Sequence, residues 1–300
     1  MKKLQITGTS GFVGQNLSKY FLSHSFEIES ISLRNSNWKY QFNGDVIIHL
    51  AGKAHDTKKG SESSEYFKVN TELTKELFDV FLKSTVNDFI YFSSVKAVAD
   101  EVADILFENI NARPKTPYGQ SKLKAEEYIL SKGIPEGKRV FIVRPCMIHG
   151  PGNKGNLNLL YNVVKKRIPY PLAAFYNERS FLGIDNLNFI IKEIIQKREI
   201  PSGVYNFSDD EVLSTNELIQ IISSTLNKKT LSIAIPKIII IGIGKIGDII
   251  KLPVNSERIQ KLTENYRVSN QKIKRAIGID KLPNTAQEGL ERTIKSFIKK

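Results

Sequence analysis

The chain has 300 residues, of which 41% are hydrophobic and 25% are charged, as in a folded globular protein with a sizeable core. The formal net charge is +13, but lysines and arginines are scattered along the whole sequence, which suits anionic small ligands and gives no nucleic-acid patch. The single cysteine, Cys146, excludes an internal disulfide, and the opening MKKLQITGTSG lacks a signal-peptide pattern. We expect a cytoplasmic protein.

The first 150 residues alternate short apolar runs with helical patterns. Strands are predicted by the runs LQIT, EIESISLR, DVIIHLAG, DFIYFSS and RVFIVRP, and helices by segments such as GFVGQNLSKYFLSH and YGQSKLKAEEYILSK. Strands that alternate with helices form right-handed crossovers and a parallel sheet covered on both faces. The pattern therefore predicts an α/β fold with a doubly wound parallel Rossmann sheet.

The sequence changes character after Pro145. The loop GPGNKGN is followed by helical patterns and short strands, and the residues from Ser214 to Glu217 predict a capping box at the start of a helix. We expect two domains. Residues 1–150 plus about 181–208 form the Rossmann domain, and about 151–180 plus 209–300 form a smaller α/β substrate-binding domain.

The longest apolar stretch runs from Ile235 to Leu252 and is interrupted by Lys237, Lys245 and Asp248. A membrane-spanning helix needs about 20 apolar residues in a row, so membrane insertion is not expected. We interpret this stretch as a buried or partner-facing helix, with a role at a membrane surface as the alternative.

A glycine-rich turn lies between the first predicted strand and the first predicted helix. Glycines at this place allow a tight turn and a close approach of the backbone to a pyrophosphate, which the helix N-terminus then binds. The turn TGTSGFVG therefore predicts a dinucleotide site. Its expected contacts are Gly8, Ser10, Gly11, Phe12, Val13 and Gly14.

The end of the second predicted strand indicates which dinucleotide is preferred. An acidic side chain there binds the ribose 2′-hydroxyl of NAD, whereas an arginine suits the 2′-phosphate of NADP. This chain has Ser32, Leu33 and Arg34 at that place and no acid. We expect NADP(H) to be preferred, with NAD(H) possible, and Ser32 and Arg34 as contacts. No metal site is expected.

Tyr118 and Lys122 are four residues apart at the start of a predicted helix. They therefore share one helix face and can point at the same ligand. A free tyrosine has a pKa near ~10, and a nearby cation favours its phenolate. The pair predicts an acid/base centre.

These motifs together resemble the extended short-chain dehydrogenase/reductase family of sugar-nucleotide epimerases, dehydratases and reductases. TGTSGFVG, DVIIHLAG, FIYFSS, YGQSK, VRPCMIHGPG, RSFLGID and YNFSD occur in the family's order over essentially the whole chain. The resemblance implies that Tyr118 is the catalytic acid/base and that Lys122 positions it. It also implies further cofactor contacts at Leu50, Ala51, Gly52, Lys53, Asn70, Ser93, Tyr118, Lys122 and Pro145. The implied substrate contacts are Ser94, Val95, Asn156, Leu157, Arg179 and, more weakly, Arg258. A homodimer through helices near residues 71–83 and 118–131 is implied in the same way.

The strand end FIYFSSVKAVAD decides between members of the family. Aligned on the following Val98-Ala99-Asp100, Val95 stands where epimerases hold the hydroxyl residue that binds the sugar oxygen, and the acid pair of the dehydratases is missing. Ser94 precedes this position by one residue, and strand alternation would turn it to the opposite face unless the strand has ended. A 4,6-dehydratase is therefore disfavoured, and a catalytic role of Ser94 depends on where the strand stops.

The chain most resembles bacterial 4-reductases that reduce UDP-4-keto-6-deoxy-N-acetylhexosamines for surface polysaccharides, such as O-antigen or capsule. The leading hypothesis is therefore an NAD(P)H-dependent reductase of such a UDP-sugar. A UDP-sugar 4-epimerase is the alternative within the fold, acting on UDP-GlcNAc/UDP-GalNAc or UDP-Glc/UDP-Gal. A non-catalytic NADP-sensing protein is the alternative of another class, and the intact Tyr118–Lys122 pair argues against it.

Overall fold

The structure is a computed structural model that describes residues 1–34, 36–54, 63–153, 155–250 and 255–298. The side chains of Ser36, Tyr40, Asn156, Glu257 and Arg258 lie outside this description.

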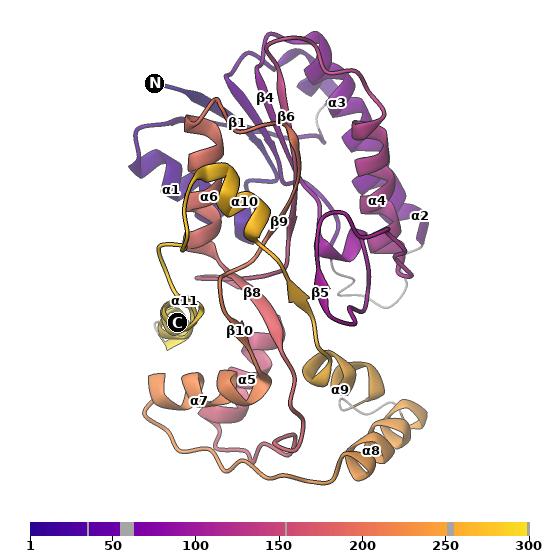
Figure 1. Ribbon diagram of the computed structural model, residues 1–300, viewed down its shortest axis with the longest axis vertical. Coiled ribbons are helices and arrows are strands. Elements are labelled where there is room, and N and C mark those ends of the chain that lie inside the picture. The colour runs from indigo at the N-terminus through magenta and orange to yellow at the C-terminus, as the bar shows by residue number, and fades with distance from the viewer. Residues whose placement is uncertain (35, 55–62, 154, 251–254, 299–300) are drawn as a thin grey trace.

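A parallel sheet of six strands, counted within the described residues, forms one half of the molecule (Figure 1). Its order is β2-β1-β3-β4-β6-β9. The strands are β1 (Lys3–Thr7), β2 (Glu27–Ile31), β3 (Val46–His49), β4 (Asp88–Phe92), β6 (Arg139–Pro145) and β9 (Gly203–Phe207). Every residue of β3, β4 and β6 is buried, as expected for a parallel sheet covered on both faces. The doubly wound α/β prediction is confirmed.

Helices cover both faces of this sheet. Helices α1 (Phe12–Ser23) and α6 (Ile184–Gln196) bury their apolar sides on one face, together with α10 (Gln271–Ile277). Helices α3 (Leu73–Lys83) and α4 (Pro117–Leu130) do so on the other face. Helix α10 belongs to the range expected in the second domain, yet it packs on the core of the sheet. The domain boundaries themselves stay a prediction.

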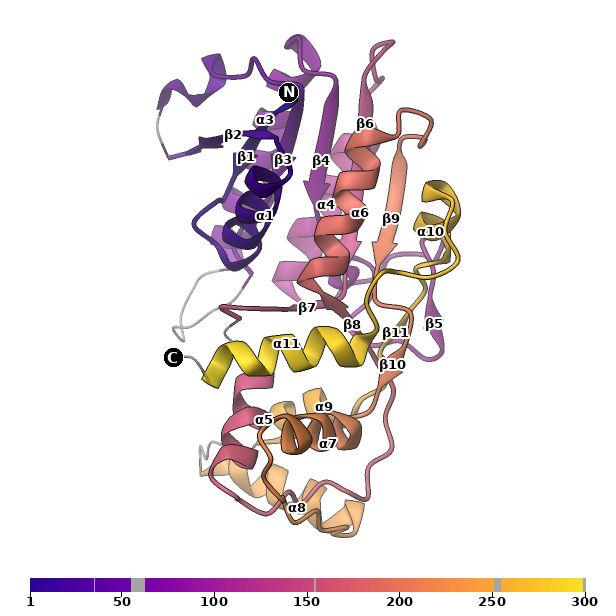
Figure 2. The same cartoon turned by 90° about the vertical axis from the view of Figure 1, so that its left-hand side faces the viewer.

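The other half of the molecule holds a small mixed sheet and five helices among the described residues (Figure 2). The sheet contains β7 (Met147–His149), β8 (Arg179–Gly183) and β10 (Val212–Leu213). The helices are α5 (Asn156–Lys165), α7 (Thr215–Thr225), α8 (Lys237–Ile249), α9 (Ser256–Thr263) and α11 (Ala286–Ile298). Helix α11 lies crosswise between the large sheet and α7. We call this half the lower lobe.

The remaining elements are short. They are β5 (Ile105–Leu106), which pairs with β11 (Arg267–Val268), helix α2 (Ser63–Tyr66), a π-helix (Phe67–Glu72) and two 3-10 helices (Ser36–Tyr40 and Val95–Ala97).

The predicted capping box is confirmed at the start of α7. The Ser214 hydroxyl accepts the Glu217 N–H at 3.1 Å, and the Glu217 carboxylate accepts the Ser214 N–H at 2.7 Å.

The long apolar stretch was expected to form a buried or partner-facing helix, and the structure does not bury it. It forms α8, which buries only Ile240, Gly244 and Gly247 and exposes most of its isoleucines. In the part of the chain that the structure describes, no helix is both long and apolar enough to cross a bilayer.

Candidate active site

The glycine turn between β1 and α1 is held by close backbone contacts. Gly8 has φ +74°, and a Cβ there would lie 2.7 Å from the backbone nitrogen of Ala51. A Cβ on Gly14 would lie 2.4 Å from the Gly8 carbonyl oxygen, which also accepts the Gly11 N–H at 3.1 Å. Both positions therefore require glycine.

The N-terminus of α1 is open to an anion. Helix α1 begins at Phe12, and within the described residues no side chain caps it and no acid lies in its first turn. Ser10 and Gly11 are exposed beside it, while Phe12 and Val13 are half-buried. Free N–H groups and the positive end of the helix dipole favour a phosphate at this point. The residues present therefore fit a dinucleotide pyrophosphate.

The segment after β3 forms a wall that runs from the glycine turn to Lys122. Leu50 and Ala51 bond to Thr7, with the Ala51 N–H donating to the Thr7 hydroxyl at 3.2 Å. A Cβ on Gly52 would lie 3.2 Å from Lys122 Nζ, so this glycine leaves room for the ammonium. The sequence-predicted residues 50–52 thus lie between the glycine turn and Lys122.

Asn70 holds this wall in place. Its side-chain oxygen accepts the Lys53 N–H at 2.7 Å, and its amide donates to the Lys53 carbonyl at 3.0 Å. The same amide donates to the Ser121 hydroxyl at 3.0 Å. Asn70 is completely buried and therefore ties the loop after β3 to α4.

Lys122 projects from α4 toward the end of β4. Its ammonium donates to the Phe92 carbonyl at 2.8 Å and lies 4.9 Å from the centre of the Tyr91 ring. Burial lowers the pKa of Lys122 to about 8, and the charge of Glu126 opposes this shift. The structure therefore keeps an amine with a depressed pKa beside the predicted cofactor wall.

Tyr118 lies one helical turn before Lys122. Thr116 caps the helix by accepting the Gly119 N–H at 3.2 Å, and Pro117 occupies the first turn. The pKa of Tyr118 is raised, because the effect of burial outweighs the opposing effect of the nearby Ser94 side chain. The edge of the Tyr66 ring faces the Tyr118 ring, with centroids 6.3 Å apart.

The position of Ser94 corrects the expectation drawn from strand alternation. Strand β4 ends at Phe92, and Ser94 has an extended backbone that leads into the 3-10 helix. The alternation rule therefore no longer applies at Ser94, whose side chain lies near enough to Tyr118 to oppose the rise in the pKa of the phenol that burial causes. Val95 is 4% exposed and packs in the core, and its predicted place facing the sugar oxygen stays a prediction.

A close backbone approach brings Ser94 and Tyr118 together. A Cβ on Gly119 would lie 2.3 Å from the Lys96 carbonyl, so only glycine lets α4 pack this tightly on the turn after Ser94. The sequence shows glycine in YGQSK but not what it contacts.

Ser93 has a different environment from the one expected. Its hydroxyl donates to the buried carboxylate of Glu126, and Arg144 donates to the same carboxylate at 2.5–3.1 Å. This network of buried charges beneath the site was not recognised from the sequence. The spacing of Lys122 and Glu126, four residues apart on a buried helix face, was the available signal.

Among the predicted substrate residues 156, 157, 179 and 258, the two whose side chains the structure describes lie in different environments. Arg179 begins β8, and its guanidinium donates to the Glu264 carboxylate at 3.3 Å. Burial lowers the pKa of Lys96, and Arg179 lies near enough for its positive charge to lower the pKa of that lysine further. Leu157 is 3% exposed and packs inside the lower lobe, so its side chain is part of a core. The side chains of Asn156 and Arg258 lie outside the described residues.

Three further predicted contacts lie at or just after strand ends. Pro145 is the last residue of β6, where it pairs with Phe207 of β9. Ser32 and Arg34 follow the end of β2 and are exposed. The sequence from 30 to 44 contains no acidic residue, so the whole segment after β2 lacks a carboxylate for a ribose.

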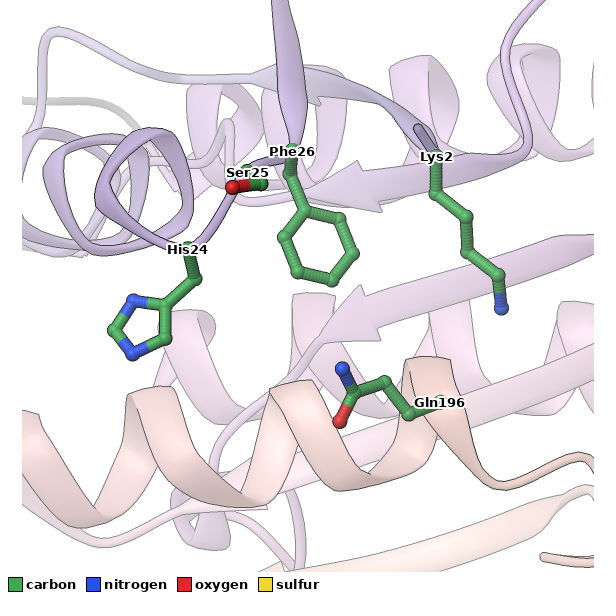
Figure 3. A pocket seen from close by; sticks show the side chains of 5 residues that line it. All are labelled: Lys2, His24, Ser25, Phe26 and Gln196. Atoms are coloured by element: carbon green, nitrogen blue, oxygen red, sulfur yellow. The ribbon is translucent and has the colours of Figure 1, made fainter.

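A surface hollow elsewhere is not part of this site (Figure 3). It is lined by Lys2, His24, Ser25, Phe26 and Gln196, which lie near the amino ends of β1 and β2. Ligands of open parallel sheets bind at the carboxyl ends of the strands, where Ser94 and Pro145 lie.

Comparison with known proteins identifies the family. Residues 4–206 match the NAD dependent epimerase/dehydratase family. A UDP-glucose 4-epimerase of Vibrio cholerae is 30% identical over 99% of this chain and 96% of its own length. The chain belongs to the NAD dependent epimerase/dehydratase family.

Other similar proteins include both epimerases and reductases. An N-acetyl-alpha-D-glucosaminyl-diphospho-ditrans,octacis-undecaprenol 4-epimerase of Escherichia coli O157:H7 is 27% identical over 96% of this chain and 93% of its own. A GDP-6-deoxy-D-mannose reductase of Pseudomonas aeruginosa is 26% identical over 74% of this chain and 79% of its own. The solved structure of RMD from Pseudomonas aeruginosa complexed with NADPH has the same fold, with a TM-score of 0.77 at 20% identity over the whole of both chains.

Proposed function

We propose that the protein is an NAD(P)H-dependent reductase of a UDP-4-keto-6-deoxy-N-acetylhexosamine that precedes surface polysaccharide synthesis. The observation that carries a redox role is the Tyr118 phenol, one helical turn from the buried Lys122 ammonium and near Ser94, at the carboxyl ends of the strands. This arrangement supplies a proton donor next to a place for a dinucleotide.

The residues of this chain have separate roles in the proposed reaction. Tyr118 gives its proton to the oxygen on C4 of the sugar, and Ser94 holds the same oxygen and the phenol in line. The Lys122 ammonium stabilises the phenolate that forms and binds the ribose nearby. Nicotinamide, when bound, supplies the hydride that C4 receives. Ketone, hydride and proton together give the alcohol.

The cofactor preference supports reduction over epimerization. An epimerase returns its cofactor to the starting state in every turn, whereas a reductase draws reducing equivalents from a free pool. Arg34 follows β2, and no acid occurs between 30 and 44, which suits the 2′-phosphate of NADPH. Arg34→Ala should therefore weaken NADPH binding more than NADH binding. An equal effect on both cofactors would contradict the assignment of Arg34.

A UDP-sugar 4-epimerase is the second candidate, and the position of Ser94 favours it. The missing hydroxyl at Val95 had argued for a simple reductase, but Ser94, which lies near Tyr118, is a candidate for that role. The Vibrio cholerae relative, which is named a UDP-glucose 4-epimerase, supports the same candidate. A 4,6-dehydratase remains disfavoured, because Lys96 and Ala97 stand where that reaction needs two acids.

A paired assay separates these functions. With NADPH and freshly generated UDP-4-keto-6-deoxy-HexNAc, we expect absorbance at 340 nm to fall with wild type and not with Tyr118→Phe. Interconversion of UDP-GlcNAc and UDP-GalNAc without added cofactor would instead establish the epimerase. Unchanged biological function of Tyr118→Phe in cells would support the NADP-sensing alternative.

A further inference from the structure

Helix α8 has an inverted packing pattern. Its buried side consists of Ile240, Gly244 and Gly247. A Cβ on Gly244 would lie 2.8 Å from the Ile259 side chain of α9, so the glycine allows the two helices to pack closely. A helix of a globular protein ordinarily buries most of its large apolar residues, whereas α8 buries one isoleucine and two glycines.

The large apolar side chains of α8 point outward. At 100° per residue, five isoleucines of α8 and its C-cap residue Ile250 occupy one arc of about 140° on the side away from α9. The exposed Ile241 lies outside this arc. The six in the arc are Ile238 (80% exposed), Ile239 (51%), Ile243 (42%), Ile246 (56%), Ile249 (80%) and Ile250 (59%). A contiguous exposed surface of this kind marks a site of interaction.

The segment that leads into α8 and forms it is basic. Residues 226–250 contain four lysines and one acid, Asp248, a net charge of +3. The exposed lysines include Lys229, Lys237 and Lys245. Helix α8 lies at the end of the molecule farthest from the large sheet in both views (Figures 1 and 2).

We propose that this end of the lower lobe docks on the surface of an anionic lipid bilayer, with α8 lying in the plane of the interface. An in-plane helix combines a wide apolar arc with cationic flanks, as α8 does. Its 13 residues are too few to span a bilayer. The six isoleucines enter the boundary between headgroups and acyl chains, and the lysines bind the anionic headgroups.

Charge argues for lipid over a second copy of the chain. In a symmetric dimer through α8, the same basic surface would face itself, and like charges would repel. An anionic bilayer complements both the apolar arc and the charge. The docking does not depend on the proposed reaction, because binding to lipid is measured without turnover.

Vesicle flotation tests this proposal with the full chain. Wild type should float with vesicles of phosphatidylglycerol and phosphatidylethanolamine, float less in high salt, and stay in the bottom fraction with phosphatidylcholine. Ile238→Asp/Ile249→Asp should reduce the bound fraction by at least ~10-fold, because two isoleucine side chains that would be buried in the lipid of the bound state are replaced by charged ones. Leu22→Asp, at a residue 61% exposed on α1, is the matched control and should float like wild type.

A second variant, which changes only charge, separates a loss of lipid binding from a loss of folding. Lys237→Glu/Lys245→Glu leaves every isoleucine in place and should also weaken flotation, with an unchanged circular dichroism spectrum. The proposal is overturned if wild type fails to float with anionic vesicles, or if both double variants float as wild type does. A solution dimer that the isoleucine variant dissociates, without any vesicle binding, would assign α8 to self-association instead.

Discussion

Replacing Lys122 with methionine should stabilise the fold at neutral pH while it removes activity. Lys122 is 5% exposed, and burial lowers its pKa from 10.5 to about 8. Each pKa unit corresponds to about 1.36 kcal/mol, so keeping the ammonium charged in the folded state costs about 3 kcal/mol relative to the unfolded chain. Methionine removes this cost. It also leaves the Phe92 carbonyl without its donor, which costs about 1–3 kcal/mol.

The stability difference between Lys122→Met and wild type should change sign with pH. Below pH 8 both the folded and the unfolded chain carry the proton, so the full cost is present in wild type. Between pH 8 and 10.5 the folded protein releases the proton first, and the cost disappears. Lys122→Met should therefore be about 1 kcal/mol more stable than wild type at pH 7 and about 1 kcal/mol less stable at pH 10.

Urea unfolding of both proteins at pH 7 and pH 10 measures this difference. Lys124→Met, at an exposed lysine of the same helix, controls for the substitution itself. Turnover of Lys122→Met should fall by about 100-fold or more, because the phenolate loses its cation. A variant already less stable than wild type at pH 7, or a difference that does not change between the two pH values, would refute the reasoning.

Three further outcomes follow from the geometry of the site. Ser94→Ala should lower kcat by about 10–100-fold with little change in cofactor affinity, and Tyr118→Phe should lower kcat further. Equal kcat for Ser94→Ala and wild type would argue against a joint role of the Ser94 and Tyr118 hydroxyls. Gly119→Ala should separate α4 from the turn after Ser94 and abolish activity, whereas Gly133→Ala, with nothing within 4 Å of its Cβ, should behave as wild type in the same assay. Burial lowers the pKa of His49 to about 3, so near pH 5 only the unfolded chain gains a proton at this residue. The free energy of unfolding of wild type should therefore fall by about 2 kcal/mol from pH 7 to pH 5, because the unfolded state is favoured. Urea unfolding should show this loss in wild type but not in His49→Asn.

The fold was predictable because its signals are local and repeated. Apolar runs that alternate with helical patterns fix a parallel sheet, and Ser214 with Glu217 fixes the start of α7. The spacing of Tyr118 and Lys122 likewise needs only the helix period.

The role of Ser94 shows where such reasoning stops. Whether Ser94 or Val95 faces Tyr118 depends on the residue at which β4 ends and on the approach of Gly119 to the following turn. Both are set by tertiary packing. The same holds for α8, where the sequence shows many isoleucines, but only the contact between Gly244 and α9 decides which side faces out.

The central claim is that hydride adds to C4 of a UDP-linked 4-ketosugar while Tyr118 protonates its oxygen. The most direct measurement is NMR of the product made with NADPH that carries deuterium at the transferred position. We predict one deuterium at C4 of the sugar for each NADPH consumed, and none with Tyr118→Phe. A UDP-sugar product inverted at C4 with no deuterium and no net consumption of NADPH would contradict the claim and establish the epimerase.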